Sequence, residues 1–259
     1  MNNLQLEQGA AETLYDLLRR LRLLLGEQLV GMYVYGSLAT GDYVPGRSDL
    51  DFLVVTDDVL PSNIVDDLES MHRTLADGSL KLAGKLEGAY VPRQVIRRHE
   101  VEHPAVPILN EGSFYLAPLG PDWDIQRYVI RKHDARLEGP PAVELIDPVE
   151  FSQVRRAISL AIDQWWEPML TDPSPLNRPG YQPFAVISMC RALHASQHAE
   201  LASKEITGRW ASVDLDPRWQ TLIEKAISWR DGDEIESIED TVEFMRHAIA
   251  LYRADLQEA

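Results

Sequence analysis

The sequence is poor in three features, each of which would have indicated a particular class of protein: cysteine, long apolar runs and positive charge. Its single cysteine, Cys190, excludes an intramolecular disulfide and fits a reducing compartment. No apolar run approaches the roughly 20 residues of a membrane-spanning helix. The first residues lack the basic start and apolar core of a signal peptide. We therefore expect a cytoplasmic protein with no membrane partner.

The charge balance argues against nucleic acid as a partner. The chain has 25 Lys and Arg against 41 Asp and Glu, a formal net charge of −16. Binding to phosphate backbones depends on Lys and Arg, so we expect no nucleic-acid partner. A cleft lined by one sign of charge concentrates ligands of the other sign, which favours a small cationic ligand. The alternative is an acidic surface that only keeps the protein soluble.

The spacing of apolar residues predicts two domains. A chain of 259 residues is long enough for two modest domains. In the first part the pattern predicts helices over 10–26, 62–76 and 121–137 and strands over 29–36, 49–56, 84–92 and 114–116. A proline-punctuated connector follows, and beyond it the pattern predicts only helices, over 151–166, 182–201, 216–230 and 234–256. We predict an α+β fold, with a mixed sheet and helices in residues 1–148 and an α-helical bundle in residues 149–259.

Two carboxylates begin the second predicted strand, within "VYGSLATGDYVPGRSDLDFLVV", residues 34–55. Alternate side chains of a strand share a face, so Asp49 and Asp51 point the same way and repel each other unless a cation lies between them. Mg²⁺ suits such a pair, because it binds one or two carboxylates together with substrate phosphates. Gly36 lets the backbone approach a phosphate closely, and Ser37 offers a hydroxyl and an N–H.

A third carboxylate, Glu87, lies in the third predicted strand. Adjacent strands are ~4.8 Å apart, so a strand beside residues 49–55 would bring Glu87 to the same patch. Three carboxylates around two metal ions serve in-line phosphoryl or nucleotidyl transfer. Glu87 could instead accept the proton of an attacking hydroxyl. A solvated turn is the alternative interpretation of the Asp-Leu-Asp segment, but the combination of Gly-Ser, Asp-x-Asp and a strand glutamate favours catalysis.

Three segments resemble known enzymes. "YGSLATGDYVPGRSDLDFLVV" resembles the signature of the DNA polymerase β-type nucleotidyltransferase superfamily. "RLEGPPAVELIDPV" and "CRALHASQHAELASKEITGRWA" resemble the linker and C-terminal helices of the streptomycin/spectinomycin class of aminoglycoside adenylyltransferases. The resemblance implies an enzyme that transfers AMP from ATP, with Mg²⁺, to a hydroxyl of an aminoglycoside. We expect it to act as a monomer.

The resemblance also implies a role for particular residues. Asp49 and Asp51 would hold two Mg²⁺ ions. Glu87 would lie at the metal ions and be the general base. The residues expected around the nucleotide are Gly36, Ser37, Ser48, Asp122, Arg191, Lys204 and Trp229. Three of them have structural alternatives: Lys204 as a solvated helix end, Arg191 as a member of an internal ion pair, and Trp229 as part of the core.

The sequence departs from the family at the acceptor side. Family members carry acidic, drug-binding side chains just before the helix that holds the Arg191-type residue. Here that stretch, "TDPSPLNRPGYQPF", contains Asp172 as its one acid and the positively charged Arg178. Phe114 or Tyr115 replaces a tryptophan that the family uses against streptomycin. The acceptor is therefore open: a different aminoglycoside, one of the usual two drugs, or another small hydroxyl compound.

Two other functions remain as alternatives. The fold could serve as a regulatory or antitoxin-type module that binds a partner protein, or it could nucleotidylate a protein or an RNA. A binding module has no need for a set of mutually repelling carboxylates, and the acidic charge disfavours RNA. No short motif distinguishes ATP from another nucleoside triphosphate.

Overall fold

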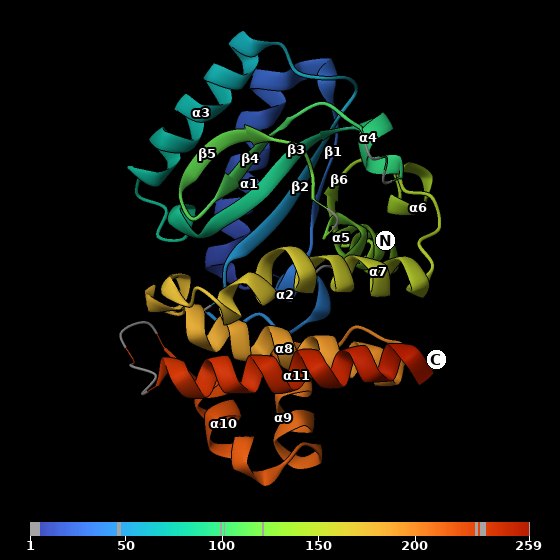
Figure 1. Ribbon diagram of the computed structural model, residues 1–259. Helices are drawn as coiled ribbons and strands as arrows, with labels where there is room; N and C mark the ends of the chain where they lie inside the picture. The colour runs from blue at the N-terminus through green and yellow to red at the C-terminus, as the bar shows by residue number, and fades with distance from the viewer. Residues whose placement is uncertain are drawn as a thin grey trace. The chain divides into compact units, whose positions relative to one another are not determined.

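The computed structural model describes residues 6–45, 48–98, 100, 102–120, 122–230, 233 and 237–258. The chain divides into two compact units, Met1–Glu150 and Phe151–Ala259 (Figure 1). The first unit contains a mixed sheet with helices and the second is helical, which confirms the predicted fold class. None of the helices in the described stretches is long and apolar enough to span a bilayer.

The described part of the first unit is built on a sheet of six strands in the order β5-β4-β3-β2-β1-β6. Their bounds are β1 Leu29–Val34, β2 Leu50–Thr56, β3 Leu86–Pro92, β4 Val106–Asn110, β5 Ser113–Ala117 and β6 Arg136–Glu138. β2 and β3 pair in parallel, whereas β1–β2, β1–β6, β3–β4 and β4–β5 are antiparallel. A parallel pair needs a crossover connection, and α3 (Ser62–Ala76) supplies it between β2 and β3.

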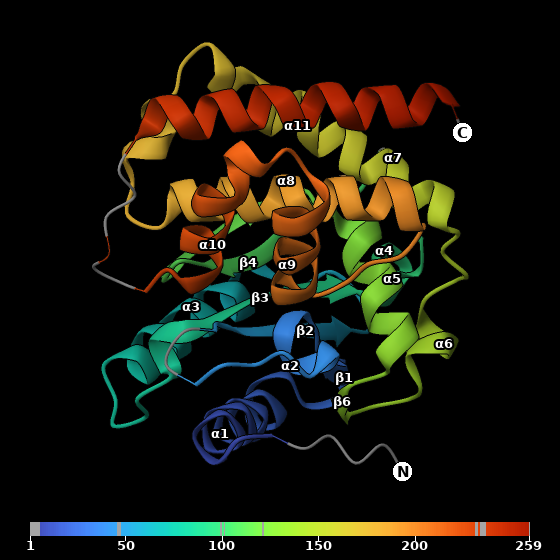
Figure 2. The ribbon, with the colours of Figure 1, turned by 90° about the horizontal axis from the view of Figure 1, so that it is seen from below.

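Two helices, α1 (Gln8–Leu25) and α3, pack with the sheet into one hydrophobic core (Figures 1 and 2). Five leucines of α1 form one apolar stripe that faces this core: Leu14, Leu17, Leu18, Leu21 and Leu25. Leu50 and Phe52 of β2 are fully buried in the same core. Because side chains alternate along a strand, Asp51 between them faces the other side of the sheet.

A buried arginine joins two further helices of this unit, α4 (Arg93–Arg97) and α5 (Trp123–His133). Arg127 of α5 is 1% exposed, and its guanidinium donates to the carbonyl oxygens of Val95 at 2.9 Å and Ile96 at 3.0 Å. It also pairs with Asp124 at 3.1 Å. A buried charge of this kind is stable only because its donors are satisfied, so Arg127 fixes α5 against the end of α4.

The second unit surrounds a central helix, α8 (Tyr181–His198). The other helices in its described part are α7 Phe151–Ala161, α9 Lys204–Asp214, α10 Gln220–Ser228 and α11 Ile238–Glu258, with short helical turns between them. α8 packs against α9, α10 and α11, and it is apolar on most sides, as expected of a helix inside a core. Cys190 lies on α8 and is fully buried, and burial raises the pKa of its thiol to about 12.

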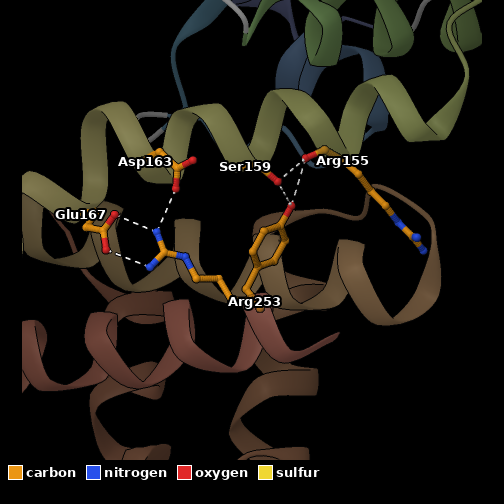
Figure 3. Close-up of polar contacts among 6 residues, drawn as sticks. Arg155, Ser159, Asp163, Glu167 and Arg253 are labelled. Carbon is orange, nitrogen blue, oxygen red and sulfur yellow. Dashed lines mark hydrogen bonds and ion pairs between the residues drawn. The ribbon is translucent and has the colours of Figure 1, made fainter. Parts of the chain in front are cut away.

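Polar contacts link α11 to α7 and to the helical turns that continue it, within the second unit (Figure 3). Arg253 donates to both carboxylate oxygens of Glu167, at 2.9 and 2.8 Å, and to Asp163 at 3.0 Å. The hydroxyl of Tyr252 donates to the carbonyl oxygen of Arg155 at 3.0 Å. Arg253 is about half exposed, so we expect its ion pairs to contribute about 1 kcal/mol or less, while the buried Tyr252 anchors the contact.

The structure adds elements that the sequence pattern did not predict. The predicted helix over 62–76 is confirmed, but the one over 121–137 ends at His133, and residues 136–138 form β6 instead. β4 and α9 were also missed. Pro107 lies within β4, and a proline argues against a strand in the sequence pattern. Gly208 lies within α9, and a glycine lowers the helix propensity of the segment. The start of the helix predicted over 234–256 lies outside the described residues, and α11 is described from Ile238.

Candidate active site

The turn after β1 requires a glycine. Tyr35 follows the strand in an extended conformation, and its N–H donates to the carbonyl oxygen of Asp51 at 3.1 Å. The short helix α2 (Gly36–Thr40) begins at the next residue. Gly36 has a φ of 56°. A Cβ at this position would lie 2.0 Å from Asp51 Oδ2 and 2.8 Å from Asp51 Cγ. The Asp51 carboxylate therefore lies against the Gly36 backbone at a distance that only glycine permits.

Parallel pairing brings the predicted carboxylates together at the start of two strands. Asp49 immediately precedes β2, and Asp51 is its second residue. In the register of β2 and β3, Asp51 is the partner of Glu87. Neighbouring strands are ~4.8 Å apart, so Asp51 and Glu87 lie side by side on the same face of the sheet. The sequence predicted this neighbourhood, while the chemical roles of these residues remain predictions.

The environment of Glu87 makes its carboxylate a stronger base than a solvated one. Burial and the negative charges of Asp49 and Glu111 raise the pKa of Glu87. The backbone N–H of Glu111, in the β4–β5 turn, donates to Glu87 Oε1 at 3.2 Å, and this hydrogen bond and Lys85 lower the pKa in part. The net direction is upward. A carboxylate with a raised pKa accepts a proton from a hydroxyl more readily.

Tyr35 is a further member of this region that the sequence analysis missed. Its side chain is 8% exposed, and its ring contacts Trp123 edge-on, with 6.1 Å between centroids. Burial raises the pKa of the Tyr35 phenol well above its usual value, and the charges of Asp51, Glu87 and Asp122 raise it further. All three carboxylates thus act on one phenol. Asp122, which was predicted near the nucleotide, therefore lies in the same region as Asp51 and Glu87.

The donor set suits a metal ion that is completed by its substrate. Among the described residues, no group of three or more His, Cys, Asp or Glu side chains is arranged to hold a metal ion. Mg²⁺ does not need such a cage, because it takes one or two carboxylates and fills its remaining positions with phosphate oxygens and water. Asp49 and Asp51 supply two carboxylates, and the ammonium group of Lys85, 3.3 Å from Asp49 Oδ1, shows that a cation fits there. The residues present therefore fit Mg²⁺ of this substrate-completed type.

The two serines predicted to contact the nucleotide lie at the edges of the same region. Ser37 is the second residue of α2 and is half-buried. Ser48 closes the loop before Asp49: its hydroxyl accepts the N–H of Val44 at 3.1 Å, and its own N–H donates to the Val44 carbonyl oxygen at 3.0 Å. Because that bond uses the hydroxyl as an acceptor, its proton is available to another partner.

The remaining predicted residues belong to the C-terminal unit. Arg191 is half-buried on α8, and Lys204 is the exposed first residue of α9, directly after the N-cap Ser203. Trp229 follows α10, where its indole N–H donates to the carbonyl oxygen of Asp233 at 2.9 Å. Its ring covers Gly180, where a Cβ would lie 2.9 Å from the ring. The roles of Arg191, Lys204 and Trp229 at a nucleotide remain predictions.

Comparisons with known proteins agree with this geometry. A nucleotidyltransferase domain model matches residues 15–102, and a model of the C-terminal domain of aminoglycoside adenylyltransferase matches residues 144–254. The chain is 24% identical to an aminoglycoside (3'') (9) adenylyltransferase of Escherichia coli, over 85% of the chain and 86% of that protein. It is 23% identical to a spectinomycin 9-adenylyltransferase of Campylobacter jejuni, over 87% and 90%.

A solved structure shows the same fold. Spectinomycin adenyltransferase AAD(9) from Enterococcus faecialis, with ATP and spectinomycin, superposes with a TM-score of 0.75 at 22% identity, over 94% of this chain and 99% of that one. The β1–α2 turn, the paired strands with their carboxylates and the matches to both domain models lead to one assignment. The chain is a nucleotidyltransferase, and in both of its domains it resembles the aminoglycoside adenylyltransferases.

Proposed function

We propose that this enzyme transfers AMP from ATP to a hydroxyl of a small cationic acceptor of the aminoglycoside class and releases pyrophosphate. The observation that carries the proposal is the parallel register that places Asp51 beside Glu87, with Asp49 one residue before the strand and Gly36 against the Asp51 carboxylate. The names of the relatives add the donor and the acceptor class. We further propose that residues 1–148 form the nucleotidyltransferase domain and residues 149–259 the helical domain.

The proposed reaction needs one proton acceptor and a means of balancing charge. The oxygen of the acceptor hydroxyl forms a bond to the α-phosphorus of ATP, and the bond from that phosphorus to the oxygen bridging to the β-phosphate breaks. Glu87 takes the hydroxyl proton, a role that its raised pKa supports. Asp49 and Asp51 would hold Mg²⁺, which when bound neutralises phosphate charge and stabilises the leaving pyrophosphate.

We propose the following residues as contacts of the nucleotide. Gly36 and Ser37, in the turn after β1, and Ser48, in the loop before β2, would contact the phosphates. Arg191 and Lys204 would supply positive charge for the triphosphate, and their place in the C-terminal domain match supports this. The remaining contacts proposed for the nucleotide site are Trp229 and Asp122.

The stretch before α8, where the relatives are expected to carry acidic drug-binding residues, has few acids in this chain. Asp172 is exposed, and its Oδ1 accepts the N–H of Ser174 at 3.1 Å. The guanidinium of Arg178 lies 5.6 Å from the ring centroid of Tyr181. A cation in this stretch opposes a polycationic drug, so a less highly charged hydroxyl compound is the second candidate acceptor. We propose that the enzyme works as a monomer in the cytoplasm, where ATP is supplied.

Pyrophosphate release tests the proposal. The purified chain is incubated with ATP, Mg²⁺ and a panel of aminoglycosides, alongside the variants Asp49→Asn, Asp51→Asn and Glu87→Gln. We expect acceptor-dependent release by the wild type and a loss of about a hundredfold or more in each variant. Asp57→Asn, at the opposite end of β2, is the matched control and should keep its activity. Near-normal turnover of Asp49→Asn would refute the mechanism. If none of the aminoglycosides supports pyrophosphate release, the proposed acceptor class is wrong.

A further inference from the structure

A lysine and an aspartate form an ion pair at the start of the two catalytic strands. Lys85 Nζ lies 3.3 Å from Asp49 Oδ1. The parallel register explains the contact: Leu50 pairs with Leu86 and Asp51 with Glu87, so residues 49 and 85 each precede a paired leucine. The segments Asp-Leu-Asp and Lys-Leu-Glu thus run side by side, with one ion pair and one pair of carboxylates on the same face.

The charge of Lys85 acts on more than one carboxylate. Asp49, Asp51 and Glu87 lie close together, and like charges at this spacing repel. Lys85 lowers the pKa of Glu87, in opposition to Asp49, which raises it. Lys85 therefore offsets part of the repulsion in the protein without metal.

The ion pair can also open. The side chains of Lys85 and Asp49 are 36% and 42% exposed. Water screens an exposed pair, and its net strength is small enough for a divalent cation to displace the ammonium group. A dication has twice the charge of lysine and binds the same oxygen at shorter range, so it competes directly with Lys85 for Asp49.

We propose that Lys85 is a positioning residue for the metal: its ammonium group occupies the cation position at Asp49 in the nucleotide-free protein and leaves it when a divalent ion binds with the nucleotide. The inference rests on the proposed function, since it concerns the same metal. A free divalent ion must displace Lys85 unaided. An ion that arrives with a triphosphate gains phosphate ligands as well, so Lys85 favours joint binding of metal and nucleotide.

Mn²⁺ binding in the absence of nucleotide tests this proposal. Free Mn²⁺ is measured by electron paramagnetic resonance during titration of the full chain. Lys85→Met keeps the length of the side chain but removes its charge, and we expect it to bind Mn²⁺ about two- to fivefold more tightly than the wild type. Lys85→Arg should restore the wild-type affinity. Lys81→Met removes a charge from an exposed position four residues earlier and should leave the affinity unchanged.

A double variant identifies the partner. In an Asp49→Asn background, Lys85→Met should change the Mn²⁺ affinity less than it does in the wild type, because the carboxylate that the two cations share is gone. Equal affinities of the wild type and Lys85→Met, or the same tightening in Lys81→Met, would overturn the proposal. Wild-type release of pyrophosphate together with an unchanged affinity in Lys85→Met refutes only the role of Lys85. A protein that binds no Mn²⁺ even with ATP refutes the metal-dependent function itself.

Discussion

The carboxylate of Asp51 lies against Gly36, with Oδ2 2.0 Å from the point where a Cβ of residue 36 would be. This contact joins the turn after β1 to the start of β2, the two segments that the sequence motif names. The close approach and the φ of 56° act in the same direction, so residue 36 controls where the Asp51 carboxylate points.

Replacement of Gly36 by alanine should therefore remove activity without unfolding the protein. The new Cβ would force the Asp51 carboxylate to move, and a displacement of about 1 Å at a reacting centre costs about a hundredfold in rate. The left-handed backbone adds a stability cost of about 1–2 kcal/mol. Steady-state turnover and urea unfolding measure the two effects. Gly84→Ala is the control, because a Cβ at Gly84 meets nothing within 4 Å. Wild-type turnover of Gly36→Ala would contradict the steric argument.

Charge at Glu87 should make the metal-free protein less stable at neutral pH. The pKa of Glu87 is raised in the folded state, so this group stabilises the fold fully below its unfolded pKa, near 4.5, and loses that contribution as the pH rises through the folded value. Glu87→Gln lacks the charge. Its free energy of unfolding in EDTA should rise relative to the wild type as the pH goes from 4 to 7. Glu27→Gln, at an exposed glutamate, controls for the substitution. A constant difference across this range would show that Glu87 is not destabilised by its surroundings.

His72 should make the folded protein less stable as the pH falls, whereas Glu87 makes it less stable as the pH rises. It is 5% exposed, its Nε2 lies 2.6 Å from the Tyr90 hydroxyl, and its Nδ1 has no hydrogen-bond partner among the described residues. Burial lowers the pKa of His72 to about 4, so the unfolded chain binds the proton first, and stability falls as the pH drops from 6.5 towards 4.

The expected loss is measurable by urea unfolding. Between pH 7 and pH 5 the wild type should lose about 2 kcal/mol more unfolding free energy than His72→Gln. His103→Gln removes a histidine elsewhere in the same unit and should keep the wild-type pH dependence. If His72→Gln retains the full wild-type slope, another group is responsible for the acid sensitivity.

The parts of the fold that could be predicted are those set by short-range patterns. The helix over 62–76 has apolar residues at helical spacing, and the structure places it there with Leu68, Met71 and Leu75 in its buried face. The strand start at Asp49 and Asp51 follows from an apolar run after a polar loop, and Glu87 was expected beside it. The helix and the strand start depend on neighbours within a few residues along the chain, whereas the place of Glu87 also required the assumption that the two strands are adjacent.

The missed features depend on pairing between segments. Pro107 lies inside β4, where the sequence alone indicates a break in the strand. The segment is a strand because it pairs with β5, in which Leu116 is the partner of Pro107. In α9, Gly208 lowers helix propensity, but a Cβ there would lie 2.6 Å from Ile227, so the glycine permits close packing against α10. The contact of Lys85 with Asp49 comes from the β2–β3 register, which neither strand reveals by itself.

The position of β2 and β3 in the sheet has a consequence for motion. Each of them is hydrogen-bonded to a strand on both sides, whereas the edge strands β5 and β6 have five and three residues. Amides in central strands exchange with solvent only when the sheet opens, while edges fray at lower cost. Slow amide exchange at Asp51 and Glu87 would therefore mark the most rigid part of the domain. The two carboxylates would then keep their spacing when the edge strands fray.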